Sequence, residues 1–230
     1  MKMSAPITHV IFDVDGLLLD TERLYTDITE TIVSRYGKKF TWDIKKRQMG
    51  QKETESARIL IDILQLPITV EEYLETAHIE QERLFPHVEL MPGAERLAQH
   101  LHDHSIPIAI ATGSSHHMMD LKTRNHKKFF SMFLHSVIST DDPEVKHGKP
   151  APDCFLVCAR RFKENPSPDK VLVFEDAENG VDAAHAAGMK CVWVPHAEQD
   201  RNTHQHKCSV VLDSLEHFNP EDFGLPAFNF

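Results

Sequence analysis

The sequence is short of basic residues and has no long apolar run. Its 230 residues contain 25 Lys and Arg but 35 Asp and Glu, which gives a formal net charge of −10 at pH 7. Nucleic acids and anionic membranes select clustered Lys and Arg, so this balance argues against both as partners. No segment approaches the roughly 20 apolar residues of a membrane helix, and the first residues lack the apolar core of a signal peptide. We therefore expect a cytoplasmic protein, and we predict that it is a monomer.

Cysteine is also scarce. The chain has four Cys and no CxxC pair, which argues against a disulfide framework and fits the reduced thiols of a cytosolic protein. Cys154 and Cys158 are four residues apart on a predicted helix and could share one face. Buried thiols explain this spacing more simply than a metal site does.

Short apolar segments alternate with helical segments along most of the chain. With 41% hydrophobic residues the chain can bury a full core. The predicted strands are residues 10–12, 106–111, 136–139, 171–174 and 190–194. The predicted helices between them are residues 93–104, 153–162 and 180–187. This alternation predicts an α/β fold with a doubly wound, Rossmann-like parallel sheet.

Residues 21–90 interrupt the alternation. Apolar residues recur there at helical spacing, as at Ile28, Ile32 and Val33, and no fully apolar strand appears. We therefore predict an α/β core domain of residues 1–20 and 91–230, with a helical cap domain of residues 21–90 inserted into it. Such an insert would cover the carboxyl ends of the strands, where open α/β sheets bind ligands.

Two acids end the first predicted strand, in the segment VIFDVDGLLLD. Side chains two residues apart in extended backbone point the same way, so Asp13 and Asp15 face one side while Val14 faces the other. Two carboxylates this close repel each other unless a cation or a shared proton compensates. Acids at a strand end are common on their own, but Gly16 lets the chain turn directly after them.

Other polar residues follow the remaining predicted strands. Thr112 and Gly113 follow the second strand, and a hydroxyl with flexible backbone can bind phosphate oxygens. Lys149 precedes a predicted helix and offers a point charge, while Glu175 and Asp176 end the fourth strand. Each feature alone also fits a helix cap or a solvated side chain. Together they bring acids, a hydroxyl and a lysine to one edge of the sheet.

This assembly resembles the haloacid dehalogenase superfamily, which includes Mg-dependent phosphatases and phosphomutases. The resemblance extends over residues 12–195 and rests on four motifs in a fixed order: DxDG at 13–16, Thr112, KP at 149–150 and ED at 175–176. It implies a doubly wound core, and the insert after the first motif resembles the helical cap of the family.

The resemblance also implies the catalytic roles. Asp13 is then the nucleophile that forms an aspartyl-phosphate, and Asp15 is the acid and base that serves the leaving group and then the attacking water. Thr112 and the backbone of Gly113 hold phosphoryl oxygens, and Lys149 offsets their charge.

The implied cofactor is Mg²⁺. Its ligands would be Asp13, the main-chain carbonyl of Asp15 and Asp176, with Glu175 nearby or bound through water. An all-oxygen set suits a hard cation that retains waters.

Cap residues are expected to select the substrate. Glu22, and Gly50 and Lys52 in the segment MGQK, match places where related enzymes contact or select the leaving group. Glu22 could instead support a helix start, and Lys52 could simply be solvated.

The expected partner is a small phosphorylated metabolite. Within the family, segments such as FDVDGLLLDTERLY and VFEDAENGVDAAHAAGM are similar to those of phosphatases acting on pseudouridine 5'-phosphate, so this nucleoside monophosphate is the favoured substrate. A sugar-phosphate phosphatase or a β-phosphoglucomutase-like phosphomutase uses the same acids and stays open. A phosphate-binding scaffold protein is the alternative without catalysis.

Overall fold

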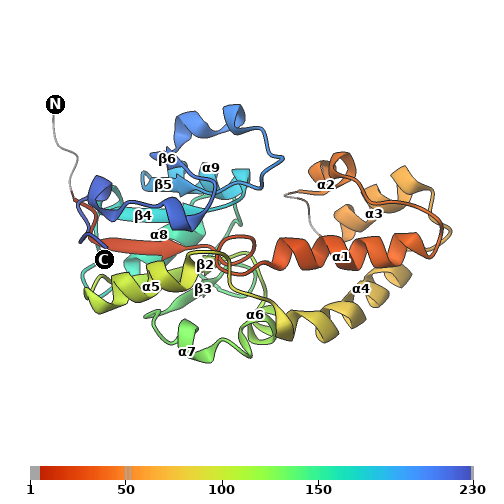
Figure 1. The fold of residues 1–230 in the computed structure, drawn as a ribbon, viewed down its shortest axis with the longest axis horizontal. Coiled ribbons are helices and arrows are strands. Elements are labelled where there is room, and N and C mark those ends of the chain that lie inside the picture. The colour runs from red at the N-terminus through yellow and green to blue at the C-terminus, as the bar shows by residue number, and fades with distance from the viewer. Residues whose placement is uncertain (1–5, 50, 52, 229–230) are drawn as a thin grey trace. The chain divides into compact units, whose positions relative to one another are not determined.

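The computed structural model describes residues 6–49, 51 and 53–228. The chain divides into two compact units. One comprises Met1–Asp20 and Glu89–Phe230, and the other is Thr21–Val88. Figure 1 labels their helices and strands along the chain.

The second boundary between the units falls after Val88, slightly before the predicted end of the insert. Two contacts explain the difference. The Asp20 N–H donates to the carbonyl of Glu89 at 2.9 Å, and Leu19 pairs with Leu90 in an isolated antiparallel bridge. Residues 89 and 90 are therefore attached to the chain that follows the first strand.

The first unit contains a parallel sheet of six strands in the order β3-β2-β1-β4-β5-β6. All neighbouring pairs are parallel. The strands are β1 His9–Phe12, β2 Ile108–Thr112, β3 Ser136–Ile138, β4 Val171–Glu175, β5 Lys190–Trp193 and β6 Val210–Val211. The sheet confirms the predicted doubly wound α/β fold. The central place of β1 explains its apolar run, because both of its faces are covered.

Four strands match the predicted bounds to within one residue, and β2 and β6 differ more. β2 begins at Ile108, after Pro107, whose carbonyl oxygen accepts the Val10 N–H at 3.0 Å. β6 was not predicted, because Val210 and Val211 are only half-buried and form no extended apolar pattern.

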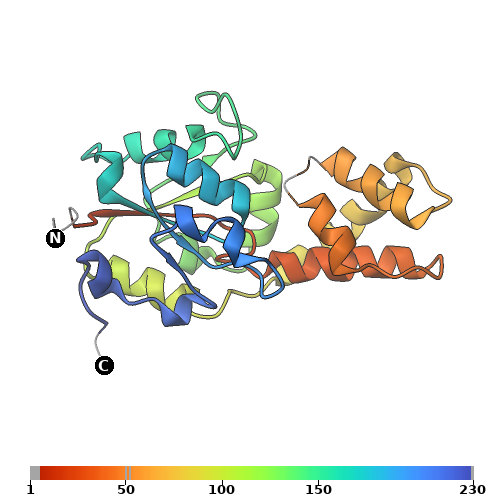
Figure 2. The ribbon, with the colours of Figure 1, turned by 90° about the horizontal axis from the view of Figure 1, so that it is seen from above.

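Helices cover both faces of the sheet, as Figure 2 shows, with α8 and α9 on one side and α5 on the other. The helices of this unit are α5 Ala94–Asp103, α6 His116–Thr123, α7 Lys127–Phe130, α8 Asp153–Arg160 and α9 Glu178–Ala186. Ile11 and Val173 pack with α8 and α9 in one buried cluster. Phe12 points to the opposite face, where its ring lies against Phe133 and stacks on Phe174.

The remaining turns of helix are short 3-10 segments: η2 Pro168–Lys170, η3 Arg201–Thr203, η4 Gln205–Lys207, η5 Leu215–His217 and η6 Pro220–Phe223. Cys154 and Cys158 are both buried on α8, which confirms that the spacing of these thiols reflects packing. Among the described residues, no helix is long and apolar enough to cross a membrane.

The second unit is helical in its described residues. It contains α1 Thr21–Ser34, α2 Trp42–Gln48, α3 Glu53–Leu64, α4 Val70–Leu84 and η1 Phe85–His87. Thr69 and Glu72 form a capping box that begins α4, each side chain bonding to the other's backbone N–H. The hydroxyl groups of Thr29 and Tyr73 lie 3.2 Å apart and join α1 to α4. The apolar periodicity of residues 21–90 thus reflects helices packed on one another.

Gly180 lets α9 approach the end of β4. A Cβ atom at this position would lie 1.8 Å from Oε1 and 1.9 Å from Cδ of Glu175. Glu175 is only 1% exposed, so its carboxylate has little room to move away. The small residue in the first turn of α9 therefore makes room for the carboxylate beneath it.

We predict that Gly180→Ala lowers the free energy of unfolding by about 1–3 kcal/mol, because the new methyl group overpacks a buried carboxylate. Urea unfolding followed by circular dichroism measures the change. Gly148→Ala is the matched control, since a Cβ there meets no atom within 4 Å. Equal stability of the two variants would contradict the steric explanation.

Candidate active site

The two acids of the first motif lie at the carboxyl end of β1. The Asp13 N–H donates to the carbonyl of Phe174 at 3.0 Å, which continues the pairing of β1 with β4 beyond Phe12. Asp13 is buried at 7% exposure. Gly16 has φ of 77°, a left-handed conformation that glycine adopts readily, so the chain turns directly after Asp15.

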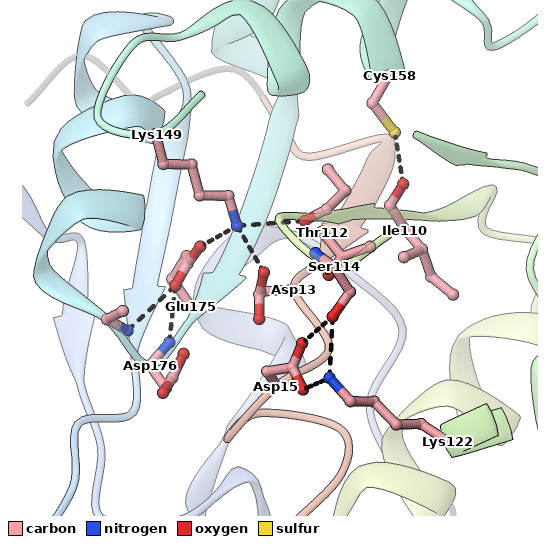
Figure 3. Close-up of polar contacts among 12 residues, drawn as sticks. Asp13, Asp15, Ile110, Thr112, Ser114, Lys122, Lys149, Cys158, Glu175 and Asp176 are labelled. Carbon is pink, nitrogen blue, oxygen red and sulfur yellow. Dashed lines mark hydrogen bonds and ion pairs between the residues drawn. The ribbon is translucent and has the colours of Figure 1, made fainter. Parts of the chain in front are cut away.

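Lys149 joins two strand ends (Figure 3). Its Nζ lies 2.5 Å from Asp13 Oδ1 and 2.5 Å from Glu175 Oε1, and it also donates to the carbonyl of Ala111 at 3.2 Å. The lysine side chain is 9% exposed. Lys149 is thus in direct contact with both of the predicted acids Asp13 and Glu175.

Burial is the largest influence on the pKa values of Asp13 and Lys149. Burial raises the pKa of the Asp13 carboxyl to about 7; Lys149 opposes the shift, while Glu175 and Asp15 add to it. Burial alone would lower the pKa of Lys149, but the charges of Asp13 and Glu175 raise it well above 10.5. The ammonium is therefore permanently charged, and Asp13 lies where further positive charge favours its ionised form.

Glu175 shapes the turn between β4 and α9. Its Oε2 accepts the backbone N–H groups of Asp176 at 3.0 Å and Ala177 at 3.1 Å, while its Oε1 binds Lys149. The carboxylate is therefore held by its own chain as well as by the lysine. This arrangement orients the turn that carries Asp176.

Asp13, Glu175 and Asp176 form a group that can hold a metal ion. One carboxylate oxygen from each lies within 4.8 Å of the others. Hard cations such as Mg²⁺ prefer oxygen ligands of this kind, so the donor set fits the expected cofactor. The indole N–H of Trp193 donates to the carbonyl of Asp176 at 2.8 Å and fixes the backbone at this residue. Participation of the Asp15 main-chain carbonyl stays a prediction.

Asp15 is held by residues that the sequence did not indicate. Lys122 Nζ lies 2.6 Å from its Oδ1, and the Ser114 hydroxyl donates to its Oδ2 at 2.7 Å. Lys122 is completely buried on α6. The only sequence signal is its place one helical turn after Met119, on the inward face, where a lysine is unexpected.

Thr112 ends β2, and Gly113 follows it directly. Thr112 is 1% exposed, and its Oγ1 accepts the Ser114 N–H at 3.1 Å. Gly113 is exposed, and a Cβ there would meet no atom within 4 Å. The glycine is therefore not required for space, and phosphoryl binding by both residues stays a prediction.

The predicted cap residues are only partly described. Glu22 lies in the first turn of α1, with its Oε2 3.0 Å from Lys45 Nζ. Lys45 also donates to Thr26 Oγ1 at 2.9 Å. Gly50 and Lys52 lie outside the described residues. Substrate selection by these residues stays a prediction, and Lys45 is an ion-pair partner that sequence reasoning missed.

Comparison with known proteins finds one hydrolase family and relatives that are named as phosphatases. Residues 7–188 match the family model described as haloacid dehalogenase-like hydrolase. The chain is 51% identical over 225 residues to (DL)-glycerol-3-phosphatase 2 of Arabidopsis thaliana, which covers 96% of this chain and 93% of that protein. It is 48% identical over 227 residues to a Drosophila melanogaster protein named "Probable pseudouridine-5'-phosphatase", covering 99% and 98%.

A solved structure shares the fold. A HAD family hydrolase from Deinococcus radiodurans superposes with a TM-score of 0.82 at 20% identity, covering 97% of this chain and 100% of that chain. The relatives named as phosphatases extend over nearly the whole chain and support a phosphoric monoester hydrolase. We conclude that this chain belongs to the haloacid dehalogenase-like hydrolases.

Proposed function

We propose that this chain hydrolyses a small phosphate monoester of a primary alcohol through an aspartyl-phosphate intermediate. The observation that carries the proposal is the buried Asp13 carboxylate, held by Lys149 at 2.5 Å beside the oxygens of Glu175 and Asp176. An anionic nucleophile can approach a phosphate dianion only where positive charge offsets their repulsion. When bound by Asp13 and Asp176, Mg²⁺ supplies such charge beside that of Lys149.

The first step transfers the phosphoryl group to Asp13. A carboxylate oxygen of Asp13 attacks phosphorus, and the bond from phosphorus to the leaving oxygen breaks with its electron pair. Asp15 gives its proton to that oxygen, so the product leaves as a neutral alcohol. Thr112, the backbone of Gly113 and Lys149 bind the phosphoryl oxygens.

The second step regenerates the enzyme. Water attacks phosphorus, and Asp15 takes the proton that the water loses. The bond from phosphorus to the Asp13 oxygen breaks, its electron pair returns to the carboxylate, and inorganic phosphate leaves. Asp15 thus acts as an acid in the first step and as a base in the second.

Pseudouridine 5'-phosphate is the substrate that we favour. The relative from Drosophila melanogaster is named for this activity, and its alignment covers 99% of this chain. The Arabidopsis thaliana relative is named for glycerol 3-phosphate at 51% identity, which makes that compound the second candidate. Both carry phosphate on a primary alcohol, so both demand the same chemistry. We further propose that the enzyme works as a monomer in the cytoplasm, where free thiols persist.

We predict that Asp13→Asn lowers phosphate release by at least about 10³-fold, because an amide cannot act as the nucleophile. Release of inorganic phosphate is measured with Mg²⁺ present, and circular dichroism checks the fold. Asp169→Asn makes the same chemical change at an exposed carboxylate and should keep full activity. Full activity of a folded Asp13→Asn variant would exclude the nucleophile assigned here.

We predict that Asp176→Asn weakens Mg²⁺ binding by on the order of 100-fold, because it removes an oxygen ligand and its charge. Isothermal titration calorimetry measures the affinity without relying on catalysis. Glu178→Gln is the control, since Glu178 lies on α9 and bonds to Thr203 instead. Equal affinities in the two variants would remove Asp176 from the ligand set.

We predict that kcat/KM is at least about tenfold higher for pseudouridine 5'-phosphate than for uridine 5'-phosphate, sugar phosphates or glycerol 3-phosphate. Purified protein with Mg²⁺ is assayed across this panel for free phosphate. A preference for glycerol 3-phosphate would replace the favoured substrate with the second candidate. Transfer of phosphate to a sugar instead of water would identify a phosphomutase, and failure across a broad monophosphate panel would leave a phosphate-binding scaffold.

A further inference from the structure

The buried Lys122, Ser114 and Asp15, the second acid of the first motif, form a closed triangle of hydrogen bonds (Figure 3). Lys122 Nζ lies 2.6 Å from Asp15 Oδ1 and 2.9 Å from Ser114 Oγ. The Ser114 hydroxyl in turn donates to Asp15 Oδ2 at 2.7 Å. Both carboxylate oxygens of Asp15 are therefore engaged, and each of the three side chains is restrained by its bonds to the other two.

The burial of the two charges is unequal. The side chain of Lys122 has 0% exposure, while that of Asp15 has 23%. Moving an ammonium group out of water is unfavourable unless an anion and hydrogen bonds compensate for it. Asp15 supplies this anion, and its partly exposed carboxylate is bound by a lysine that is itself fully buried.

The two acids of the first motif thus have separate lysine partners. Lys149 contacts Asp13 and Glu175, while Lys122 contacts Asp15. The two lysines come from different segments, α6 and the loop before α8. A change at Lys122 therefore removes a contact of Asp15 and leaves the contacts between Lys149 and Asp13 in place.

We infer that Lys122 is a positioning residue for proton transfer by Asp15. Together with Ser114 it fixes the rotamer of the carboxyl group, so that the group stays oriented toward the leaving oxygen. The inference rests on the proposed function, in which the Asp15 proton goes to that oxygen as its bond to phosphorus breaks. Positioning within hydrogen-bond reach determines how effective such a transfer is.

This role predicts a dependence on the leaving group. An alkoxide from a primary alcohol is a poor leaving group and needs the proton of Asp15. The p-nitrophenolate ion spreads its charge over the ring and leaves without a proton. Because kcat/KM reports events up to the first release of alcohol or phenol, it isolates the step in which Asp15 acts as an acid.

The test compares Lys122→Met with the wild-type enzyme on glycerol 3-phosphate, pseudouridine 5'-phosphate and p-nitrophenyl phosphate. We expect kcat/KM for the better of the two alkyl phosphates to fall on the order of 100-fold, within the range of general acid catalysis. The kcat/KM for p-nitrophenyl phosphate should fall by a much smaller factor. Lys128→Met removes the same charge at an exposed position. It should leave unchanged the ratio of kcat/KM for the alkyl phosphate to kcat/KM for p-nitrophenyl phosphate.

A second variant keeps the test decisive. Ser114→Ala removes only the hydroxyl of the triangle and should shift the same ratio in the same direction, by a smaller factor. Circular dichroism and urea unfolding check both variants. If Lys122→Met does not fold, the ratio measured for Ser114→Ala decides the question.

Two results overturn the inference. If both substrate classes lose kcat/KM by the same factor in a folded variant, Lys122 only supports the fold. If neither value changes, the triangle does not position Asp15. A wild-type enzyme that hydrolyses none of these esters overturns the proposed function itself, and the inference with it. Activity of the wild-type enzyme therefore distinguishes failure of the proposed function from failure of the role inferred for Lys122.

Discussion

Two buried carboxylates, those of Asp13 and Glu175, share the ammonium group of Lys149 at 2.5 Å each. Without that charge, the burial of the two carboxylates and the repulsion between them would be left uncompensated. The contact also joins three parts of the chain: the ends of β1 and β4 and the loop before α8. The rest of the site depends on this bridge, because it sets where the Asp13 carboxylate and the turn that carries Asp176 lie.

The site divides its charges between two lysines with different surroundings. Lys149 serves the carboxylates next to the proposed metal ion, and Lys122 serves Asp15. Separate partners fit the different roles proposed for two acids that are close in sequence, attack on phosphorus for Asp13 and proton transfer for Asp15. The sheet makes this separation possible, because side chains from neighbouring parallel strands meet at their carboxyl ends.

Much of the fold could be predicted from local patterns. The apolar segments that became β1, β4 and β5 were recognised because central parallel strands are buried on both faces. β6 and α6 were not predicted, since Val210–Val211 is too short for a pattern and α6 begins among the polar residues of a strand-end loop. Of the candidate site residues, Asp13, Lys149, Glu175 and Asp176 come together as the order of motifs indicated.

The sequence by itself determined which chemistry is available, because acids, a threonine and a lysine follow predicted strands in an order characteristic of one family. Only the tertiary structure decided which charges pair. Lys122 and Asp15 are 107 positions apart, and no local pattern reports a contact over such a distance. Likewise, the sequence could not tell that the Glu175 carboxylate would accept the N–H groups of the next two residues and bind Lys149, because burial and backbone geometry at the end of β4 select those partners.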